Sequence, residues 1–180
     1  MRKSGQWEIA VKHLLNARAI ADEIGHAQVQ AETRVELAWA LLGTGDLPSA
    51  EQAAEEALGH PYLPARAGSA LVAGVVRLLR GELPAAELRL QDAVRRAQEQ
   101  LRVNPQSYHM LDTQALALAG LTLTGADDRT GDAIAAFQAA RAVTTAYGIT
   151  ARFLRMFAAL SLADPTGRLR PLEVATRSGT

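Results

Sequence analysis

Residues 38–57 read AWALLGTGDLPSAEQAAEEA, and residues 74–93 repeat the arrangement as GVVRLLRGELPAAELRLQDA. Each stretch has a small residue, a Gly seven positions later and an Ala five positions after that Gly. An Ala or Leu and then another Ala follow at steps of four and three positions. Residues at these steps share one helix face, and a Gly suits the left-handed end of a helix. The pattern predicts two antiparallel helices that pack closely across a Gly turn.

The motif recurs on both sides of these stretches. Residues 5–17 hold an N-terminal copy that begins at Gly5. Residues 128–140 hold a fourth copy, in which Asp128 replaces the Gly and Gly125 predicts a longer turn. A repeated unit is expected to stack on its neighbours, because one unit cannot bury its apolar face alone. The aligned positions are Ala10, Leu14 and Ala17, then Ala50, Ala54 and Ala57, then Ala86, Leu90 and Ala93, and finally Ala133, Phe137 and Ala140.

Single residues of the motif carry specific expectations. Gly74 lies inside a predicted helix, where Gly costs about 1 kcal/mol relative to Ala, so we expect a close helix contact there. The equivalent small residue in the fourth copy is Ala119 or Gly120. Trp7 follows Gly5 by two positions and is expected to make a core or end-cap contact.

The composition favours an all-α protein and indicates no chemistry. The 180 residues carry 19 basic and 19 acidic side chains, so the formal net charge is zero. A balanced charge argues against a nucleic-acid binder and against an anionic-membrane binder. Hydrophobic residues make up 48%, aromatic residues only 4%, and Cys is missing. These values exclude disulfide scaffolds, thiolate catalysis and cysteine-ligated zinc, and they favour packed helices over a β-sandwich.

Helical periodicity continues along almost the whole chain, and no stretch has the alternation of a strand. We expect about eight antiparallel helices over residues 1–163 and a poorly ordered tail over residues 164–180. The sequence shows no secretory signal and no apolar run long enough to cross a bilayer, which indicates a cytoplasmic protein without a membrane partner. The expected helices are 6–24, 27–42, 48–59, 65–80, 84–102, 107–122, 130–147 and 150–163.

The motif resembles the tetratricopeptide repeat. Its members, in order, are a small residue, a Gly, a Leu or an aromatic residue, an Ala, a bulky apolar residue and a second Ala. The resemblance covers residues 5–163, and its spacings depart from the usual period of about 34 residues. The distance from Gly5 to Gly45 is 40 positions, and from Gly45 to Gly81 it is 36. The resemblance implies a right-handed α-α superhelix. The long helices also resemble the divergent repeats of bacterial multidomain regulators, such as ATP-dependent transcription activators of the maltose-activator type.

The resemblance also implies which residues form a concave groove, because the first helix of each pair lines that face. An apolar groove that holds a Trp suits a partner helix or a peptide, since a large rigid aromatic often anchors binding. The alternative is that Trp39 packs between neighbouring repeats. The implied partner-binding positions are Glu32, Val35, Trp39 and Leu42 in one repeat, Gly68, Leu71, Val75 and Leu78 in the next, and Asp112 with Ala115 in the third.

The ends of the predicted stack are unbalanced. The first predicted helix matches the second helix of a repeat pair, and no first helix precedes it in the prediction. The last predicted helix matches the first helix of a pair, and no second helix follows it in the prediction. We expect a segment of a larger bacterial protein, and the alternative is that the first helix and the tail act as caps. Uncapped ends leave an apolar face open and predict self-association. Residues 171–174 of the tail are apolar enough to occupy the groove.

No cluster of residues predicts a catalytic, cofactor or metal site. The four His residues are far apart, and no serine-nucleophile or phosphate-binding motif occurs. Asp127, Asp128 and Asp132 lack the spacing of a calcium loop and are interpreted as turn and capping residues. Arg152 and Arg155 lie on one side of the last predicted helix, either as ordinary surface residues or as a site for an anion or a partner.

Two functions of different classes follow, and we expect neither catalysis nor a cofactor. The first is a non-catalytic helical repeat scaffold that binds a protein or peptide in its groove without touching nucleic acid. The alternative is a ligand-sensing domain of a multidomain ATP-dependent transcription regulator, in which a small molecule changes the curvature of the stack.

Overall fold

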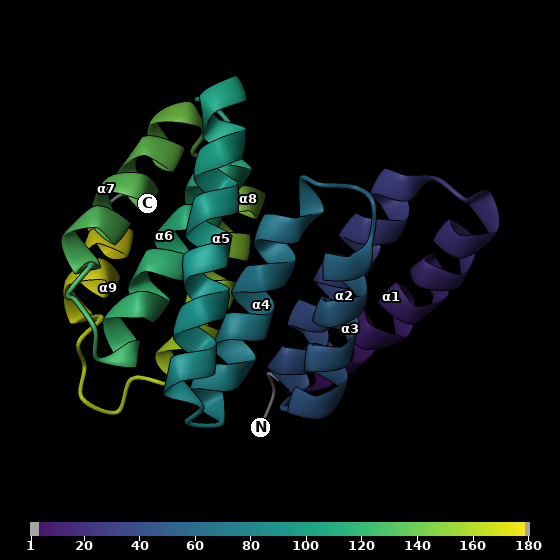
Figure 1. The fold of residues 1–180 in the computed structure, drawn as a ribbon, viewed down its shortest axis with the longest axis horizontal. Coiled ribbons are helices and arrows are strands. Elements are labelled where there is room, and N and C mark those ends of the chain that lie inside the picture. The colour runs from purple at the N-terminus through teal and green to yellow at the C-terminus, as the bar shows by residue number, and fades with distance from the viewer. Residues whose placement is uncertain (1–3, 179–180) are drawn as a thin grey trace.

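The structure is a computed structural model that describes residues 4–178, and these residues form helices with no strand among them (Figure 1). This confirms the predicted all-α helical repeat. Each predicted helix is present, and a further short helix follows the last of them. In chain order the helices are α1 (Ser4–Ile24), α2 (Ala27–Thr44), α3 (Leu47–Gly59), α4 (Ala65–Leu79), α5 (Leu83–Val103), α6 (Tyr108–Thr124), α7 (Thr130–Val143), α8 (Tyr147–Ser161) and α9 (Arg170–Ser178).

A glycine turn joins the two helices of a pair, α2 with α3 and α4 with α5, as the motif predicts. Gly45 follows α2 with a φ of 84°, and Gly81 follows α4 with a φ of 74°. A residue with a Cβ adopts these angles only at a cost. Asp46 then caps α3, because its carboxylate accepts a hydrogen bond of 3.2 Å from the backbone N of Ser49. Pro48 lies in the first turn of α3. Backbone N–H groups in this turn have no acceptor within the helix, so the N–H that Pro lacks costs no helical hydrogen bond.

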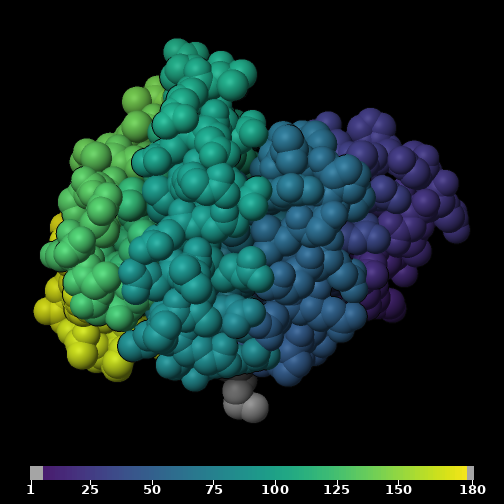
Figure 2. All heavy atoms as spheres, in the orientation of Figure 1, coloured from purple at the N-terminus to yellow at the C-terminus, as the bar shows by residue number. Residues whose placement is uncertain are grey.

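Each helix from α1 to α6 packs against the next one along the chain, and α2 with α4, α4 with α6, and α8 with both α6 and α2 are also in contact. Since α4 contacts both α2 and α6, these three helices form an inner row. The odd-numbered helices cover the other side of that row. Figure 2 shows this succession on the surface, where the colours change in bands from α1 through α5 to α7. The right-handed sense of the superhelix stays a prediction.

The recurring small residues mark the places where helices approach most closely. A Cβ built on Gly74 of α4 would lie 2.7 Å from side-chain carbons of Leu90, and one on Gly120 of α6 would lie 2.9 Å from the same side chain. Leu90 of α5 therefore fills the space between α4 and α6, and the expected close contact at Gly74 is confirmed. The motif residues Ala50, Ala54, Ala57, Ala86, Ala93, Ala133 and Ala140 are all 0% exposed.

The boundary between the seventh and eighth helices differs from the prediction. α7 ends at Val143, and Thr144 is extended, with φ −156° and ψ 136°. α8 begins at Tyr147, so Gly148, expected to end the seventh helix, lies in the first turn of α8. Thr144 and Thr145 are β-branched, and two such residues in succession favour the extended backbone at this break.

The segment expected to be a poorly ordered tail contains helix α9, which packs against α7 and not in the groove. The carboxylate of Asp164 organises the preceding turn by accepting hydrogen bonds of 3.0 and 2.8 Å from the backbone N of Arg168 and Leu169. Leu169 and Leu172 are then buried, at 2% and 0% exposure. Two leucines are too few to give a periodic pattern, so only the contact with α7 reveals this helix. Residues 179–180 of the expected tail lie outside the described residues.

Candidate functional site

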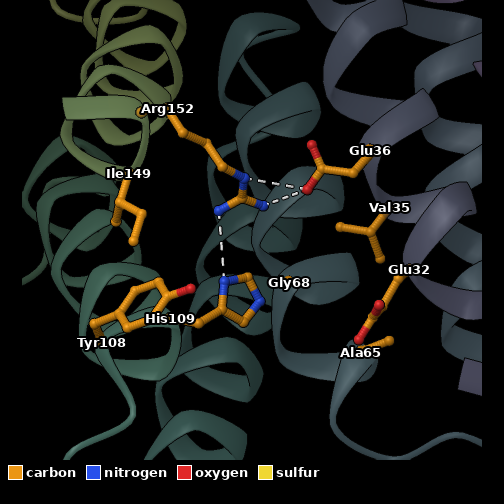
Figure 3. A pocket seen from close by; sticks show the side chains of 10 residues that line it. Glu32, Val35, Glu36, Ala65, Gly68, Tyr108, His109, Ile149 and Arg152 are labelled. Atoms are coloured by element: carbon orange, nitrogen blue, oxygen red, sulfur yellow. Dashed lines mark hydrogen bonds and ion pairs between the residues drawn. The ribbon is translucent and has the colours of Figure 1, made fainter. Parts of the chain in front are cut away.

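α8 lies across the inner row and contacts both α6 and α2. An ion pair joins it to α2, because Nε and Nη2 of Arg152 both donate to Oε1 of Glu36, with the Nε contact at 3.2 Å. Figure 3 shows Arg152 reaching between Glu36 and His109. Glu36 and Arg152 are 116 positions apart, so only the folded chain brings them together.

Two pockets lie on either side of this ion pair, and Glu36 and Arg152 line both of them. The polar pocket has a volume of about 430 Å³ and lies between α2, α4, α6 and α8. The apolar pocket has a volume of about 650 Å³ and lies between α1, α2 and α8. We refer to the two pockets together as the α2–α8 trough. The polar pocket is lined among others by Glu32, Val35, Tyr108, His109 and Ile149, and the apolar pocket by Trp7, Leu14, Trp39, Leu42, Met156 and Leu162.

The trough follows from the spacing of residues on two helices. Its lining residues recur at steps of three and four positions, which places them on one face of each helix. At a rise of about 1.5 Å per residue, the stretch from Glu32 to Leu42 extends the trough over about 15 Å. This is the length of a short peptide segment. The recurring residues are Glu32, Val35, Glu36 and Trp39 on α2, and Ile149, Arg152, Met156 and Ala159 on α8.

The polar pocket contains an imidazole that is neutral at pH 7. Burial of His109 and the nearby Arg152 guanidinium lower its pKa to about 4, against a smaller opposing effect of the Glu36 carboxylate. Nη1 of Arg152 lies 3.4 Å from Nδ1 of His109. Because a guanidinium only donates, Nδ1 must accept this bond and Nε2 carries the ring proton. The pocket therefore offers a neutral N–H donor, a carboxylate and a guanidinium.

Both Trp residues of the chain line the apolar pocket. Trp39 is only 5% exposed on α2. The ring of Trp7 on α1 covers Gly43 of α2 so closely that a Cβ on Gly43 would collide with it, as expected for a core or end-cap contact of Trp7. Arg155 and Leu162 also line this pocket and are exposed, so its apolar wall is open to solvent on the α8 side.

Arg141 connects α8 to a buried ion pair between α6 and α7. Nη2 of Arg141 on α7 donates to both carboxylate oxygens of Asp112 on α6 at 2.7 Å, and its Nη1 donates to Oγ1 of Thr150 on α8 at 2.9 Å. The guanidinium also lies 5.2 Å from the centre of the Phe137 ring. Burial raises the pKa of Asp112 to about 6, although Arg141 opposes the rise. Arg141 therefore links three helices.

The structure divides the predicted groove residues into two sets. Those in the trough are Glu32, Val35 and Gly68, which line the polar pocket, and Trp39 and Leu42, which line the apolar pocket. The others line neither of these two pockets, because α4 contacts α2, α3, α5 and α6 and is buried on nearly all sides, while Asp112 pairs with Arg141. These buried residues are Leu71, Val75, Leu78, Asp112 and Ala115.

Several residues of the trough carry no motif that sequence reasoning could have used. Tyr108, His109 and Ile149 reach the polar pocket because α8 lies across the inner row. The candidate partner site at Arg152 and Arg155 does lie in the trough. The available signal was the spacing of Arg152 and Met156 on one helix face, but that spacing does not say which helix the face meets.

Among residues 4–178, no group of three or more His, Asp or Glu side chains is placed to hold a metal ion. None of the described helices combines the length and the apolar character that crossing a membrane requires. Comparisons of the chain with protein-family models, curated proteins and solved structures find no match. The case for a function therefore depends on the α2–α8 trough.

Proposed function

We propose that this chain is a non-catalytic helical repeat module of the tetratricopeptide type that binds a protein or peptide segment in the α2–α8 trough. The observation that carries the proposal is the trough itself. Two helices present facing rows of side chains over about 15 Å and leave two open pockets between them. A peptide helix laid along such a groove is a common mode of recognition. We place the module in a larger bacterial regulatory protein of the cytoplasm.

Trp39 is the anchor of the proposed site. Trp39 is 5% exposed, belongs to the hydrophobic core and lines the apolar pocket, so its position is already set by the fold. A large aromatic side chain that is ordered before binding loses little conformational freedom when a partner arrives. Leu42 extends the same apolar wall along α2. These two residues are the groove positions of the motif that reach the apolar pocket.

Selection of peptides from a displayed library against the full chain tests this function. Selected peptides should slow hydrogen–deuterium exchange in α2 and α8 and change the tryptophan emission. Trp39→Ala should weaken their binding by about 1 kcal/mol or more while the helical circular dichroism is kept. Slowed exchange confined to α3, α5 and α7, or unchanged affinity of a folded Trp39→Ala variant, would contradict the proposal.

A ligand-sensing domain is the second candidate, and the Glu36–Arg152 ion pair favours it. The two side chains are 42% and 27% exposed, so a small molecule in either pocket can reach them. A ligand that displaced Arg152 would loosen α8 from α2 and change the shape of the trough. Both pocket volumes also lie within the range typical of small-molecule sites. A metabolite that shifts the tryptophan emission and excludes the selected peptides would support this second function.

A further inference from the structure

The apolar pocket carries one positive charge that no described acidic residue neutralises. Its charged lining residues are Glu36, Arg152 and Arg155. Glu36 and Arg152 neutralise each other as an ion pair. Arg155 is exposed and forms no ion pair with any residue from 4 to 178. A solvent-exposed guanidinium beside an apolar pocket favours an occupant that brings an acidic group to the same place.

The remaining lining of this pocket is apolar and is provided by three helices. Trp7 comes from α1, Trp39 and Leu42 from α2, and Met156 and Leu162 from α8 and the residue that follows it. Leu162 is 75% exposed, although the neighbouring Trp39, Leu42 and Met156 are buried. A large apolar group in the pocket would cover Leu162 and remove it from water, which is favourable. The pocket therefore favours an occupant that has both an apolar surface and a negatively charged group.

The trough continues past the apolar pocket. The Glu36–Arg152 ion pair also lines the polar pocket, so the same surface extends along α2 as far as Glu32. Over this length of about 15 Å a helical segment makes about three turns. Such a segment can place a large apolar side chain between Trp7 and Trp39 and follow α2 with its remaining turns. The extended shape of the site favours a peptide segment over a small molecule.

We propose that the trough recognises an amphipathic segment of a partner protein that has large apolar residues on one face and acidic residues beside them, one of which pairs with Arg155. This inference rests on the proposed function and names the chemistry of the partner. The apolar residues supply most of the affinity, and the acidic residue sets the preferred composition and the orientation. Because the pair with Arg155 is exposed, its effect on affinity is modest and depends on salt.

Three synthetic peptides of about twelve residues test the inference on the full chain. The first has leucine on one helix face and glutamate on the other, the second replaces glutamate with lysine, and the third replaces leucine with serine. Tryptophan emission reports binding directly, because both Trp residues of the chain line the apolar pocket. The glutamate peptide should bind at least about threefold more tightly than the lysine peptide at low salt, and the serine peptide should not change the emission.

Exposed positions provide variants that keep the fold and have matched controls. Arg155→Glu should reverse the preference between the glutamate and lysine peptides, whereas Arg102→Glu, at an exposed position of α5, should leave it unchanged. Leu162→Ser should weaken the glutamate peptide at least about threefold. Leu88→Ser is its control, because Leu88 is 70% exposed on α5 and does not line the trough.

Each contrary outcome rejects a specific part of the inference. Equal affinity of the glutamate and lysine peptides, or an unchanged preference in Arg155→Glu, rejects the acidic partner while the binding function stands. If decanoate changes the tryptophan emission and none of the peptides does, the peptide segment is rejected in favour of a small apolar acid. If library-selected peptides slow exchange only outside α2 and α8, the proposed function and this inference both fail.

Discussion

The carboxylate of Glu36 on α2 and the guanidinium of Arg152 on α8 form the ion pair that divides the α2–α8 trough into its polar and apolar pockets. Arg152 also donates to His109 on α6, so one side chain links α2, α6 and α8. This contact and the buried Arg141–Thr150 hydrogen bond add polar links to α8, whose Phe153, Phe157 and Leu160 are buried in the hydrophobic core.

Glu36→Gln should loosen α8 with little loss of global stability. The pair is partly exposed, and such pairs contribute about 0–1 kcal/mol to folding. We therefore expect faster hydrogen–deuterium exchange in α8 and a free energy of unfolding in urea within about 1 kcal/mol of the wild type. Glu173→Gln, which removes an exposed pair with Arg177 on α9, is the control. Unchanged exchange in α8 would show that the ion pair does not hold this helix.

Gly74→Ala should destabilise the fold by about 1–2 kcal/mol, although Ala is the better helix former. The new Cβ would lie 2.7 Å from carbons of Leu90, so the side chain or α5 must move. Gly131→Ala, where nothing lies within 4 Å of the added Cβ, should not destabilise. In a Leu90→Ala background the cost of Gly74→Ala should disappear, and a purely additive double variant would contradict the proposed contact.

Asp112→Ala should destabilise the chain by about 3–5 kcal/mol, because it leaves the Arg141 guanidinium buried without its carboxylate. Replacing both residues in Asp112→Leu/Arg141→Met should cost much less, since no buried charge remains. Urea unfolding at neutral pH measures both free energies. A double variant as unstable as Asp112→Ala would mean that the loss comes from packing and not from the unpaired charge.

Acid should remove stability that depends on His109. Its pKa is about 4 in the folded chain, against 6.5 for an ordinary histidine side chain, so the unfolded chain takes up a proton first as the pH falls. The folded state therefore loses about 2 kcal/mol between about pH 7 and about pH 4.5. Asp112 acts in the opposite direction, because its raised pKa of about 6 lets the folded state bind a proton first.

Comparison with His109→Gln separates these two effects. The Gln side chain keeps a hydrogen-bond acceptor for Arg152 and has no group that titrates in this range. The stability of the variant should fall less than that of the wild type over the same pH interval, because only the contribution of Asp112 and other carboxylates remains. Parallel pH profiles of wild type and variant would refute a buried neutral imidazole at this position.

The outer face of α1 should support the self-association expected from the sequence. Ile9, Ile20 and Ile24 are 60%, 56% and 67% exposed on this terminal helix, which packs mainly against α2. We expect a concentration-dependent increase in sedimentation coefficient that Ile20→Glu abolishes. Val103→Glu, at an 86% exposed position at the end of α5, is the matched control. A wild-type monomer at all concentrations would exclude this interface.

Local spacing along the chain is enough to predict the helices, their Gly turns and the small residues that let them pack. These features depend on neighbours within one or two turns of the same chain, and so they appear as periodic spacing. Gly45, Gly81 and Ala50 lie as the motif requires. The early end of α7 at Val143 was missed because a β-branched pair competes locally with helical periodicity.

The way in which the last helices meet the first is visible only in the folded chain. α8 lies against α2, so Arg152 meets Glu36 across 116 positions, while Leu169 and Leu172 order α9 against α7. The pairing of Asp112 with Arg141 is likewise a product of the fold. Such contacts join residues far apart in sequence, and their energy depends on packing that no spacing along the chain encodes.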